Sequence, residues 1–486
     1  MRCLALAQAW REDGGRAIFC GRIESDFLAR CLAGEDMEVI ETGAEPGHTL
    51  EALDRRGLGN AWVALDGYHF GAEWQEVLVA AGHRVLVLDD GARLPRYRAH
   101  AILAAEHDAR PSRYDAPAST VILAGSRYRL LRRGFVATPR LPRGPGDGAV
   151  VLVSFGGADS RNATCAALTG LGRVLGAADR ALVVVGPLNP HEQEIARLLD
   201  RACFQHELHR AVDDMRGLYS RADLAISAAG GSAWELAVCG VPSILVPVAE
   251  NQVPGMRHLA AAGAALTVDD IPAMLGDGFP RLVSGLLADA DALRAMARRG
   301  QAACDGRGAS RVCRVLRCLD RAPGCEEFLV RPALPDDMEQ VFRLANDRTV
   351  RDNSFSPEPI SLADHAAWFG ERISSPATAF YVMEFEGVVA AVARFDAVGG
   401  IADTDVAVHP AFRGRGLAAR MLKECSAQAA ARLRVSHLRA VVFECNAASR
   451  RSFLRGGFHE SGRQTLSGRD CAIFDWQASR EGAHVG

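Results

Sequence analysis

Short apolar runs recur along the first two thirds of the chain, each bounded by Gly or Asp and followed by a helix-like stretch. The runs are AIFCG (17–21), MEVIETG (37–43), AWVALDG (61–67), RVLVLDDG (84–91), AILAA (101–105), AVVLVSFGGAD (149–159), RALVVVG (180–186), ADLAISAAGG (222–231) and PSILVPVA (242–249). This alternation is typical of βα units on a parallel sheet. It predicts α/β lobes, with TPRLPRGPGDG (138–148) as the linker between two of them.

A different pattern follows the basic, helical stretch 301–325 and the break APGCEE. FLVRPALPDDMEQVFRLAND predicts strand, turn and helix, and AFYVMEFEGVVAAVARFD predicts antiparallel strands. We therefore expect three domains, at about 1–140, 141–322 and 326–480: two Rossmann-like lobes followed by an α+β domain. A chain of 486 residues, 49% of them hydrophobic, is large enough for this number.

Charge and cysteine content exclude several classes of partner. The 56 Lys+Arg nearly balance the 59 Asp+Glu, so the chain has no broad basic field for nucleic acid or an anionic membrane. The 13 Cys form no C-x-x-C pair, and no apolar run reaches the roughly 18–20 residues of a membrane span. We expect a cytoplasmic protein with reduced thiols, no bound metal and no nucleic-acid or membrane partner; the oligomeric state stays open.

The first candidate binding turn lies in VLVSFGGADSRNAT. Gly156 and Gly157 come directly after a predicted strand, and Asp159, Asn162 and Thr164 lead into a helix. Glycines at such a turn bring amide groups near a ligand, and a helix N-terminus favours anions. An ordinary βα turn is an equally good interpretation of this segment alone.

A more specific pattern lies in ADLAISAAGGSAWELAVCGVPSILVPVAENQ. A strand ends at Gly230, Gly231 and Ser232, so the next helix presents free amides to a phosphate pair, and Glu235 in its first turn can accept both hydroxyls of a ribose. The polar residues at the carboxyl end of the next strand are Glu250, Asn251 and Gln252. Glu235 alone could be a helix-dipole acid, but the whole set predicts a nucleotide-sugar site.

The stretches FGGADSRN, VVVGPLNPHEQE, LYSRADLAISAAGGSAWE and VPSILVPVAENQ resemble the nucleotide-sugar hydrolase family of the pseudaminic acid pathway. That family is related to two-lobed, GT-B-like glycosyltransferases that make peptidoglycan lipid precursors. The resemblance covers about residues 1–320, including LDGYHF (65–70), VLVLDDGA (85–92) and DGRGASRV (305–312). It implies hydrolysis of UDP-2,4-diacetamido-2,4,6-trideoxy-β-L-altropyranose to the free sugar and UDP. In the family pattern the second-lobe glycines, Glu235 and Asn251 hold the UDP.

The start of the chain departs from this family. The family opens with a strand and a G-x-G-H-x-x-R-C-L-x-L-A segment whose His is the expected base for water. This chain begins MRCLALAQAW, which predicts an amphipathic helix with Leu4, Ala5 and Ala7 placed for packing, and Arg2 matches the family Arg. Either the start lies several residues upstream or hydrolysis is lost. Replacement bases would be His69 or His83, each a better packing or surface residue, whereas Asp66 and Tyr68 suit sugar contacts.

The segment IADTDVAVHPAFRGRGLAARMLKECSAQAA predicts a strand, a Pro-marked turn, a Gly-rich loop and a long helix. Arg413, Gly416 and Ala418 fit the pattern [RQ]-x-x-G-x-[GA], and Gly414 is an additional glycine. Successive amides in such a loop can cradle a pyrophosphate at the helix N-terminus, and Arg413 and Arg415 would add positive charge.

Together with VVFECNAASRRSFLRGGF, this segment resembles the GNAT acetyltransferases, over about residues 327–478. The resemblance implies acetyl-CoA as co-substrate, bound along a strand that splays from its neighbour. The implied acetyl-CoA residues are Val406, Val408, Arg413, Gly414, Arg415, Gly416, Leu417, Ala418, Asn446 and Phe453, the last at the place of a family Tyr that protonates the leaving thiolate. NDRTVRDNSFSPEPISLADHAAWF (346–369) resembles the acceptor-binding helices of the branch that acetylates amino sugars, so the implied acceptor is the 4-amino group of a UDP-amino-sugar.

Acetyl transfer also needs a group that takes a proton from the amine. Asp403, Asp405 and Glu444 are the candidates on the relevant strands, with His409 as another option, and alternation places Asp403 and Asp405 on one strand face. The sequence thus predicts a bifunctional enzyme that acetylates and hydrolyses UDP-sugars. A glycosyltransferase and a catalytically dead UDP-sugar-binding module remain the alternatives for the first two lobes.

Overall fold

The computed structural model describes residues 1–24, 26–106, 108–135, 148–210, 212, 214–321 and 327–478. The predicted linker 138–148 and the predicted break 322–327 lie outside the described residues, apart from Gly148 and Glu327. Two compact units are present: one holds Met1–Leu58, Ala105–Ala109 and Ala124–Cys313, and the other holds Gly59–Ala104, Arg110–Leu123 and Arg314–Gly486. The boundaries of these two units differ from the boundaries expected for three domains.

The first unit begins with helices around a small apolar cluster. Helix α1 (Arg2–Glu12) buries Leu4 and Ala7 against Leu32 of α2 (Asp26–Gly34), as the amphipathic pattern predicts. Strands β1 (Ile18–Cys20) and β2 (Glu38–Ile40) pair in parallel, and α3 (Pro46–Arg55) follows.

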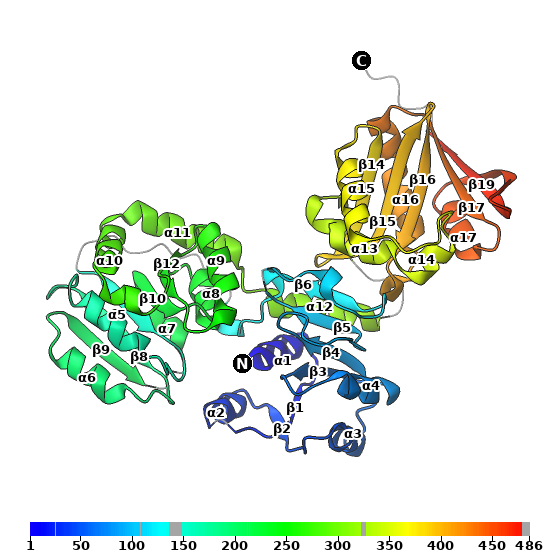
Figure 1. Cartoon of the computed structure of the whole chain (residues 1–486). Coiled ribbons are helices and arrows are strands. Elements are labelled where there is room, and N and C mark those ends of the chain that lie inside the picture. The colour runs from blue at the N-terminus through cyan, green and yellow to red at the C-terminus, as the bar shows by residue number, and fades with distance from the viewer. Residues whose placement is uncertain are drawn as a thin grey trace. The chain divides into compact units, whose positions relative to one another are not determined.

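The rest of the first unit is a six-stranded sheet in the order β12-β11-β10-β7-β8-β9, parallel throughout (Figure 1). Its strands are β7 (Val150–Ser154), β8 (Arg180–Val185), β9 (Gln205–Arg210), β10 (Leu224–Ala228), β11 (Ser243–Val246) and β12 (Leu266–Thr267). Alternate residues of β7 face two apolar layers, Val151 and Val153 on one side and Leu152 on the other. Because the strand order reverses between β7 and β10, the carboxyl ends of these strands flank the place where such sheets bind ligands.

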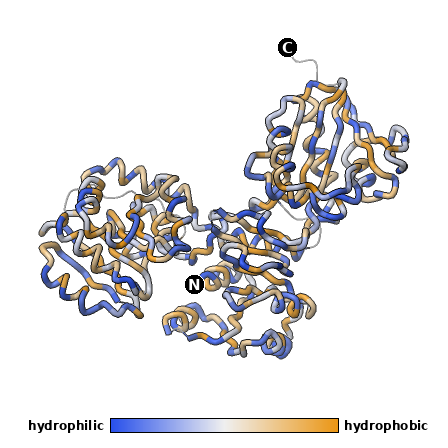
Figure 2. The backbone as a smooth tube through the Cα atoms, viewed as in Figure 1, coloured by the Kyte–Doolittle hydropathy of each residue, from blue (hydrophilic) through white to orange (hydrophobic). Residues whose placement is uncertain are grey.

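Helices cover both faces of this sheet. They are α5 (Ala163–Leu171), α6 (Glu192–Asp200), α7 (Met215–Tyr219), α8 (Gly231–Val238), α9 (Val253–Ala261), α10 (Gly278–Ala288) and α11 (Ala290–Ala303), with short 3-10 turns η2 (Ser126–Tyr128), η3 (Arg133–Phe135), η4 (Glu250–Gln252) and η5 (Pro272–Leu275). Figure 2 shows hydrophobic residues concentrated along the strands and hydrophilic residues along the loops.

The second unit contains a four-stranded sheet in the order β3-β4-β5-β6. Its strands are β3 (Trp62–Asp66), β4 (Arg84–Leu88), β5 (Ala101–Ala104) and β6 (Val121–Ala124), with α4 (Ala72–Ala80) between the first two and η1 (Pro111–Arg113) before the last. The prediction of one parallel sheet for the first third of the chain is therefore wrong, because β1 and β2 form a separate sheet. Each of these two strands has three residues, none fully buried, whereas β5 is buried throughout.

The remainder of the second unit is a mostly antiparallel sheet in the order β13-β14-β15-β16-β17-β19-β18 (Figure 1). Its strands are β13 (Leu329–Pro332), β14 (Thr378–Phe385), β15 (Val388–Val398), β16 (Ile401–Val408), β17 (His437–Phe443), β18 (His459–Leu466) and β19 (Arg469–Gln477). Its helices are α13 (Met338–Ala345), α14 (Arg348–Asp352), α15 (Leu362–Ser374), α16 (Leu417–Leu433) and α17 (Ala447–Arg455), preceded in the chain by α12 (Gly308–Asp320) and joined by η6 (Pro335–Asp337) and η7 (Pro410–Phe412). The predicted α+β pattern of this domain is confirmed.

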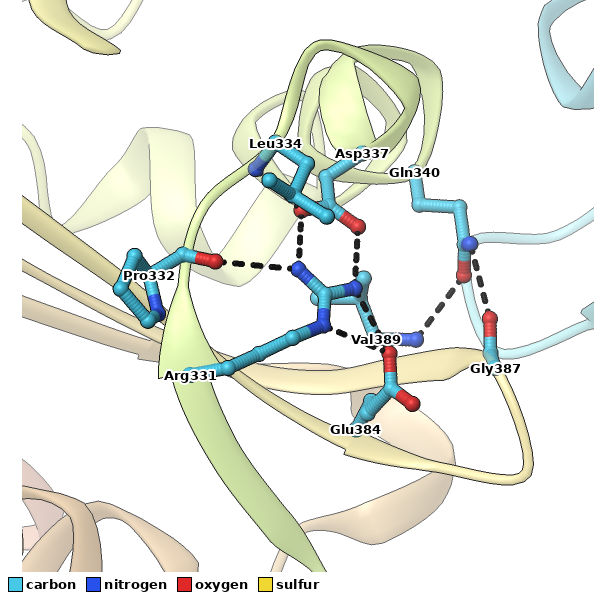
Figure 3. A network of polar contacts seen from close by, with 8 residues as sticks. All are labelled: Arg331, Pro332, Leu334, Asp337, Gln340, Glu384, Gly387 and Val389. Carbon is cyan, nitrogen blue, oxygen red and sulfur yellow. Dashed lines mark hydrogen bonds and ion pairs between the residues drawn. The ribbon is translucent and has the colours of Figure 1, made fainter.

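Helix α13 is fixed to its sheet by the polar network of Figure 3. Arg331 of β13 donates two hydrogen bonds to Asp337, at 2.7 and 2.8 Å, and two to Glu384 of β14. Gln340 donates to the carbonyl of Gly387 and accepts from the amide of Val389, so it bridges α13 to the β14–β15 turn. Because Asp337 is almost fully buried, its pairing with Arg331 holds the start of α13 in one position.

Candidate functional site

The N-terminus of α8 is the strongest candidate anion site in the second lobe. The helix begins at Gly231 with Gly230 at its N-cap, and no side chain caps it. Gly231 is exposed, and a Cβ there would meet open space. Gln252 lies close by, since its amide nitrogen is 3.3 Å from the place of a Gly230 Cβ. The structure thus brings together two segments that the sequence predicted for one site, and α8 offers amides to a phosphate.

Glu235 lies just after the first turn of α8, slightly later than the sequence pattern predicted, and it is held by a tyrosine that the pattern did not indicate. The Tyr219 hydroxyl of α7 donates to its carboxylate at 3.1 Å. Burial raises the pKa of Glu235, while Arg132 and the Tyr219 hydrogen bond oppose the rise. This hydrogen bond uses one carboxylate oxygen of Glu235, Oε2. Ser232 is half-buried near the start of α8. Glu250 and Asn251 are exposed in η4, which follows β11.

The turn after β7 has the features of an ordinary βα turn, one of the two interpretations that the sequence allowed. Gly156 has a φ of +82° and so needs glycine. The carboxylate of Asp159, however, accepts from the amides of Ala163 and Thr164 at 2.8 and 3.0 Å. The first amides of α5 are therefore already bound to an anion of the chain itself, which leaves them unsuited to a phosphate.

Asn162 is also engaged elsewhere, because its amide donates to Glu194 of α6 at 2.9 Å. Gly157 packs against Gly186, where a Cβ would come within 2.3 Å of the Gly157 carbonyl oxygen. The Asn162 side chain thus already has a protein partner, Gly156 and Gly157 form a tight turn, and a ligand role for these three residues stays a prediction.

The remaining candidates of the first lobe occupy several places. Arg2 opens α1, Asp66 ends β3, and Tyr68 is 72% exposed, with the Arg93 guanidinium 4.1 Å from the centre of its ring. His69 is exposed beside Phe70, whereas His83 is only 3% exposed. Burial makes His83 a packing residue, as the simpler interpretation held.

The predicted acetyl-CoA loop is open to a ligand. Gly414 and Gly416 have φ values of +81° and +74°, and a Cβ at either position would meet nothing within 4 Å. Gly416 is the N-cap of α16, a helix of 17 residues that no side chain caps. Positive φ explains why glycine stands at both positions, and the open space faces an uncapped helix start.

The two arginines of this loop, which the sequence predicted to add positive charge, both contact other parts of the protein. The Arg413 guanidinium forms an ion pair with Asp347 and donates to the carbonyl of Val408 at 3.2 Å. Arg415 donates to the sulfur of Cys318 at 3.3 Å and lies over the ring of Phe412. Both guanidiniums therefore have protein partners, and the backbone amides are the loop's main donors for a pyrophosphate.

Strand β16 separates from β17 as the resemblance implied. The two strands pair in parallel only at Ala402 with Leu438 and at Asp403 with Arg439, although β17 continues to Phe443. Val406 and Val408 pair with β15 on their other side. Their edge towards β17 is thus available for the hydrogen bonds of an extended ligand.

The other predicted cofactor residues have different surroundings. Leu417 is buried and Ala418 half-buried in the first turn of α16. The Asn446 side chain caps α17 by accepting from the Ser449 amide at 3.0 Å. Phe453 is 2% exposed and packs against Phe458 and Phe474, so it presents almost no surface to a ligand. Phe453 thus packs in the apolar core, and its role in binding the cofactor stays a prediction.

Two of the candidate acids lie on β16, and the third, Glu444, follows the end of β17. Asp403 and Asp405 share one face of β16, as predicted, opposite Asp396 and Arg394 of β15. Asp403 is exposed like Asp405, but partial burial, and then the nearby Asp405 and Asp396, raise its pKa. Asp405 is 73% exposed and ion-paired with Arg394.

Glu444 and His409 are less suited to proton transfer. Glu444 forms an ion pair with Arg463 at 3.1 Å. His409 is buried, accepts from the Ala411 amide, and has a pKa lowered to about 4, chiefly by burial. Of the four candidates, Asp403 has the raised pKa that suits a base.

Two family models match parts of this chain. Residues 327–459 match the Acetyltransferase (GNAT) domain, and residues 165–303 match the Glycosyltransferase family 28 C-terminal domain. The chain is thus similar to a glycosyltransferase family 28 C-terminal domain in one segment and to a GNAT acetyltransferase domain in a later one. The described part of the chain contains no group of three or more His, Cys, Asp or Glu placed to hold a metal, and no helix in it is long and apolar enough to cross a membrane.

Relatives of the first two lobes are similar in sequence and in fold. The chain is 26% identical over 209 residues to the spore coat polysaccharide biosynthesis protein SpsG of Bacillus subtilis, covering 43% of this chain and 61% of that protein. It is 29% identical over 295 residues to the UDP-N-acetylglucosamine--N-acetylmuramyl-(pentapeptide) pyrophosphoryl-undecaprenol N-acetylglucosamine transferase of Halorhodospira halophila, covering 54% of this chain and 79% of that protein. The crystal structure of Acinetobacter baumannii MurG aligns with a TM-score of 0.50 and 16% identity, covering 65% of this chain and 95% of that chain. The predicted fold, two GT-B-like lobes followed by a GNAT domain, is confirmed.

Proposed function

We propose that the C-terminal domain transfers an acetyl group from acetyl-CoA to the 4-amino group of a UDP-amino-sugar. The observation that carries this proposal is the open glycine loop at the start of α16 beside the free edge of β16. The match of residues 327–459 to the GNAT family supports acetyl-CoA as the co-substrate. Amides at a helix start suit its pyrophosphate, and an exposed strand edge suits its amide-rich pantetheine arm.

The proposed reaction is a direct acyl transfer. The neutral amine attacks the thioester carbonyl carbon, a C–N bond forms, and the C–S bond breaks. Asp403 accepts the amine proton directly or through water, and the CoA thiolate leaves and takes a proton from water. The raised pKa of Asp403 brings this carboxylate nearer to the operating pH than an ordinary aspartate.

We propose that the second lobe binds the UDP part of a nucleotide sugar. The start of α8 would receive the pyrophosphate, and Glu235 would accept the ribose hydroxyls. The match of residues 165–303 to glycosyltransferase family 28 supports this placement. Hydrolysis of UDP-2,4-diacetamido-2,4,6-trideoxy-β-L-altropyranose in a cytoplasmic pseudaminic acid pathway is the finer proposal, in which water attacks the anomeric carbon and UDP leaves.

Acetyl transfer is tested with the full chain, acetyl-CoA and a UDP-4-amino-sugar. We expect CoA release that depends on the sugar, together with an N-acetylated sugar detected by mass spectrometry. CoA release that does not respond to the UDP-amino-sugar would overturn the acceptor assignment.

The role of the lobes is tested with the UDP-diacetamido sugar. UDP release in water supports hydrolysis. Binding without release supports a UDP-sugar-binding module, and release only after a sugar or lipid acceptor is added supports a glycosyltransferase. Absence of any UDP binding by calorimetry would overturn the site at α8.

A further inference from the structure

Helix α13 carries a second polar face besides the one in Figure 3. Glu339 and Arg343 are four residues apart and so lie on one side of the helix. Both contact the segment 110–117, which belongs to the same compact unit and precedes β6 of the four-stranded sheet. We call residues Glu339 and Arg343 the docking face.

Glu339 recognises the start of this segment. It is 8% exposed, and its carboxylate accepts from the Ser112 amide at 3.0 Å, the Ser112 hydroxyl at 2.8 Å and Arg110 at 3.1 Å. Three donors on one buried carboxylate form a specific contact, because a buried charge without them would be costly.

Arg343 recognises the rest of the segment through backbone carbonyls. Its guanidinium donates to the carbonyl oxygens of Tyr114 at 2.9 Å, Pro117 at 3.3 Å, Ala116 at 3.4 Å and Pro111 at 3.5 Å. Burial lowers the pKa of Arg343, and Asp115 opposes this effect. If the segment moved away, a buried cation would lose four acceptors at once.

The segment itself is anchored to its own sheet. Tyr114 is buried with its ring 5.4 Å from that of Tyr97, and the Tyr97 amide donates to the Asp115 carbonyl at 2.8 Å. Thr120 donates its hydroxyl to the Ala99 carbonyl. The docking face therefore contacts a rigid surface.

The end of α13 leads directly to the glycine loop. Asp347, just beyond α13, caps α14 by accepting from the Val350 amide and is ion-paired with Arg413. Arg343 also lies near His409, at the turn before Arg413, and contributes to its lowered pKa. A shift of α13 would therefore move Asp347 and, through it, Arg413.

We propose that segment 110–117 holds the acetyl-CoA loop in its binding conformation through the docking face, so that Arg343 and Glu339 are positioning residues for acetyl transfer. This inference rests on the proposed use of acetyl-CoA. By this proposal, the acetyltransferase site is partly held in place by residues that lie more than 200 positions before α13 in the chain.

The test uses the full chain with changes on the segment, outside the acetyltransferase domain. The variant R110M/S112A removes two of the three bonds to Glu339, and S119A, an exposed serine of the same connection, is the control. We expect R110M/S112A to raise the Kd for acetyl-CoA at least tenfold by calorimetry and to raise deuterium uptake at residues 409–417. S119A should change neither quantity.

Changes on the helix complete the test. Arg343→Met should raise deuterium uptake in both 110–117 and 409–417, and Arg343→Lys, which keeps the charge, should restore part of the acetyl-CoA affinity. Uptake that rises at 110–117 with unchanged uptake at 409–417 and unchanged affinity would overturn the proposal. If wild-type chain binds no acetyl-CoA, the proposed function fails, and the uptake at 409–417 in R110M/S112A still decides whether the segment holds the loop.

Discussion

Asp347 and Arg413 form an ion pair that joins the end of α13 to the glycine loop before α16. Asp347 is 6% exposed, and Arg413 also donates to the Val408 carbonyl at the end of β16. The Arg413 guanidinium thus links the end of α13, the end of β16 and the glycine loop. We expect the backbone amides of Gly414 and Gly416 to contact the ligand.

Gly416→Val is expected to abolish acetyl-CoA binding. A β-branched residue at a φ of +74° costs at least about 1–2 kcal/mol and places bulk where the pyrophosphate would lie. Gly468→Val is the matched control, because Gly468 has the same φ and equally open surroundings in the β18–β19 turn. Calorimetry with acetyl-CoA should show loss of binding in the first variant alone; equal affinities in both would refute the placement of the cofactor.

Asp403→Asn is expected to lower kcat for acetyl transfer by about 100-fold. Since burial and neighbouring carboxylates raise the pKa of Asp403, the wild-type rate should rise with pH through that pKa, and this limb should vanish in the variant. Asp405→Asn should retain the limb, because Asp405 is exposed and paired with Arg394. A pH–rate profile in which Asp405→Asn loses the limb instead would assign the base to Asp405.

Glu235→Gln is expected to gain stability relative to the wild type as pH rises. Burial raises the pKa of Glu235 above its unfolded value, so the stabilising contribution is complete below the unfolded pKa and is lost as pH rises through the folded pKa. Tyr219→Phe removes a hydrogen bond that opposes the rise and should steepen the loss. Thermal unfolding from acidic to neutral pH measures both trends, and parallel curves for all three chains would contradict them.

Arg331→Met is expected to destabilise the acetyltransferase domain by about 3 kcal/mol, because it leaves Asp337 and Glu384 buried without their shared cation. Arg348→Met is the control: this arginine is 94% exposed, and its 3.8 Å pair with Asp352 contributes only about 0–1 kcal/mol. Urea unfolding followed by circular dichroism compares the two variants. Similar midpoints would mean that the network in Figure 3 adds little to stability.

The sequence predicted those features that depend on local patterns. Apolar runs bounded by glycine correctly predicted the strands of the second lobe. The Gly-rich pattern that begins at Arg413 predicted a loop whose glycines do have positive φ. Both follow from backbone conformation and burial, which neighbouring residues largely determine.

Features that depend on distant side chains could not be predicted. Arg413 pairs with Asp347 some 66 positions away, and the Tyr219 hydroxyl contacts Glu235 from another helix. None of these partners has a spacing that marks it in the sequence. The grouping of β1 and β2 in a sheet of their own likewise has no signal in the local pattern.

The second compact unit is assembled from three separate stretches of chain. Trp62 and Arg84 bind Asp320 of α12, and the neighbouring Cys318 accepts from Arg415 of the glycine loop. The Cys318–Arg415 contact and the contacts of the docking face with segment 110–117 both join residues 1–321 to residues 327–486. These two stretches, produced as separate polypeptides, should therefore reassociate into a heterodimer that co-purifies without a covalent link. By the same reasoning, a homologous acetyltransferase domain exchanged into this position would need its own compatible partner for segment 110–117.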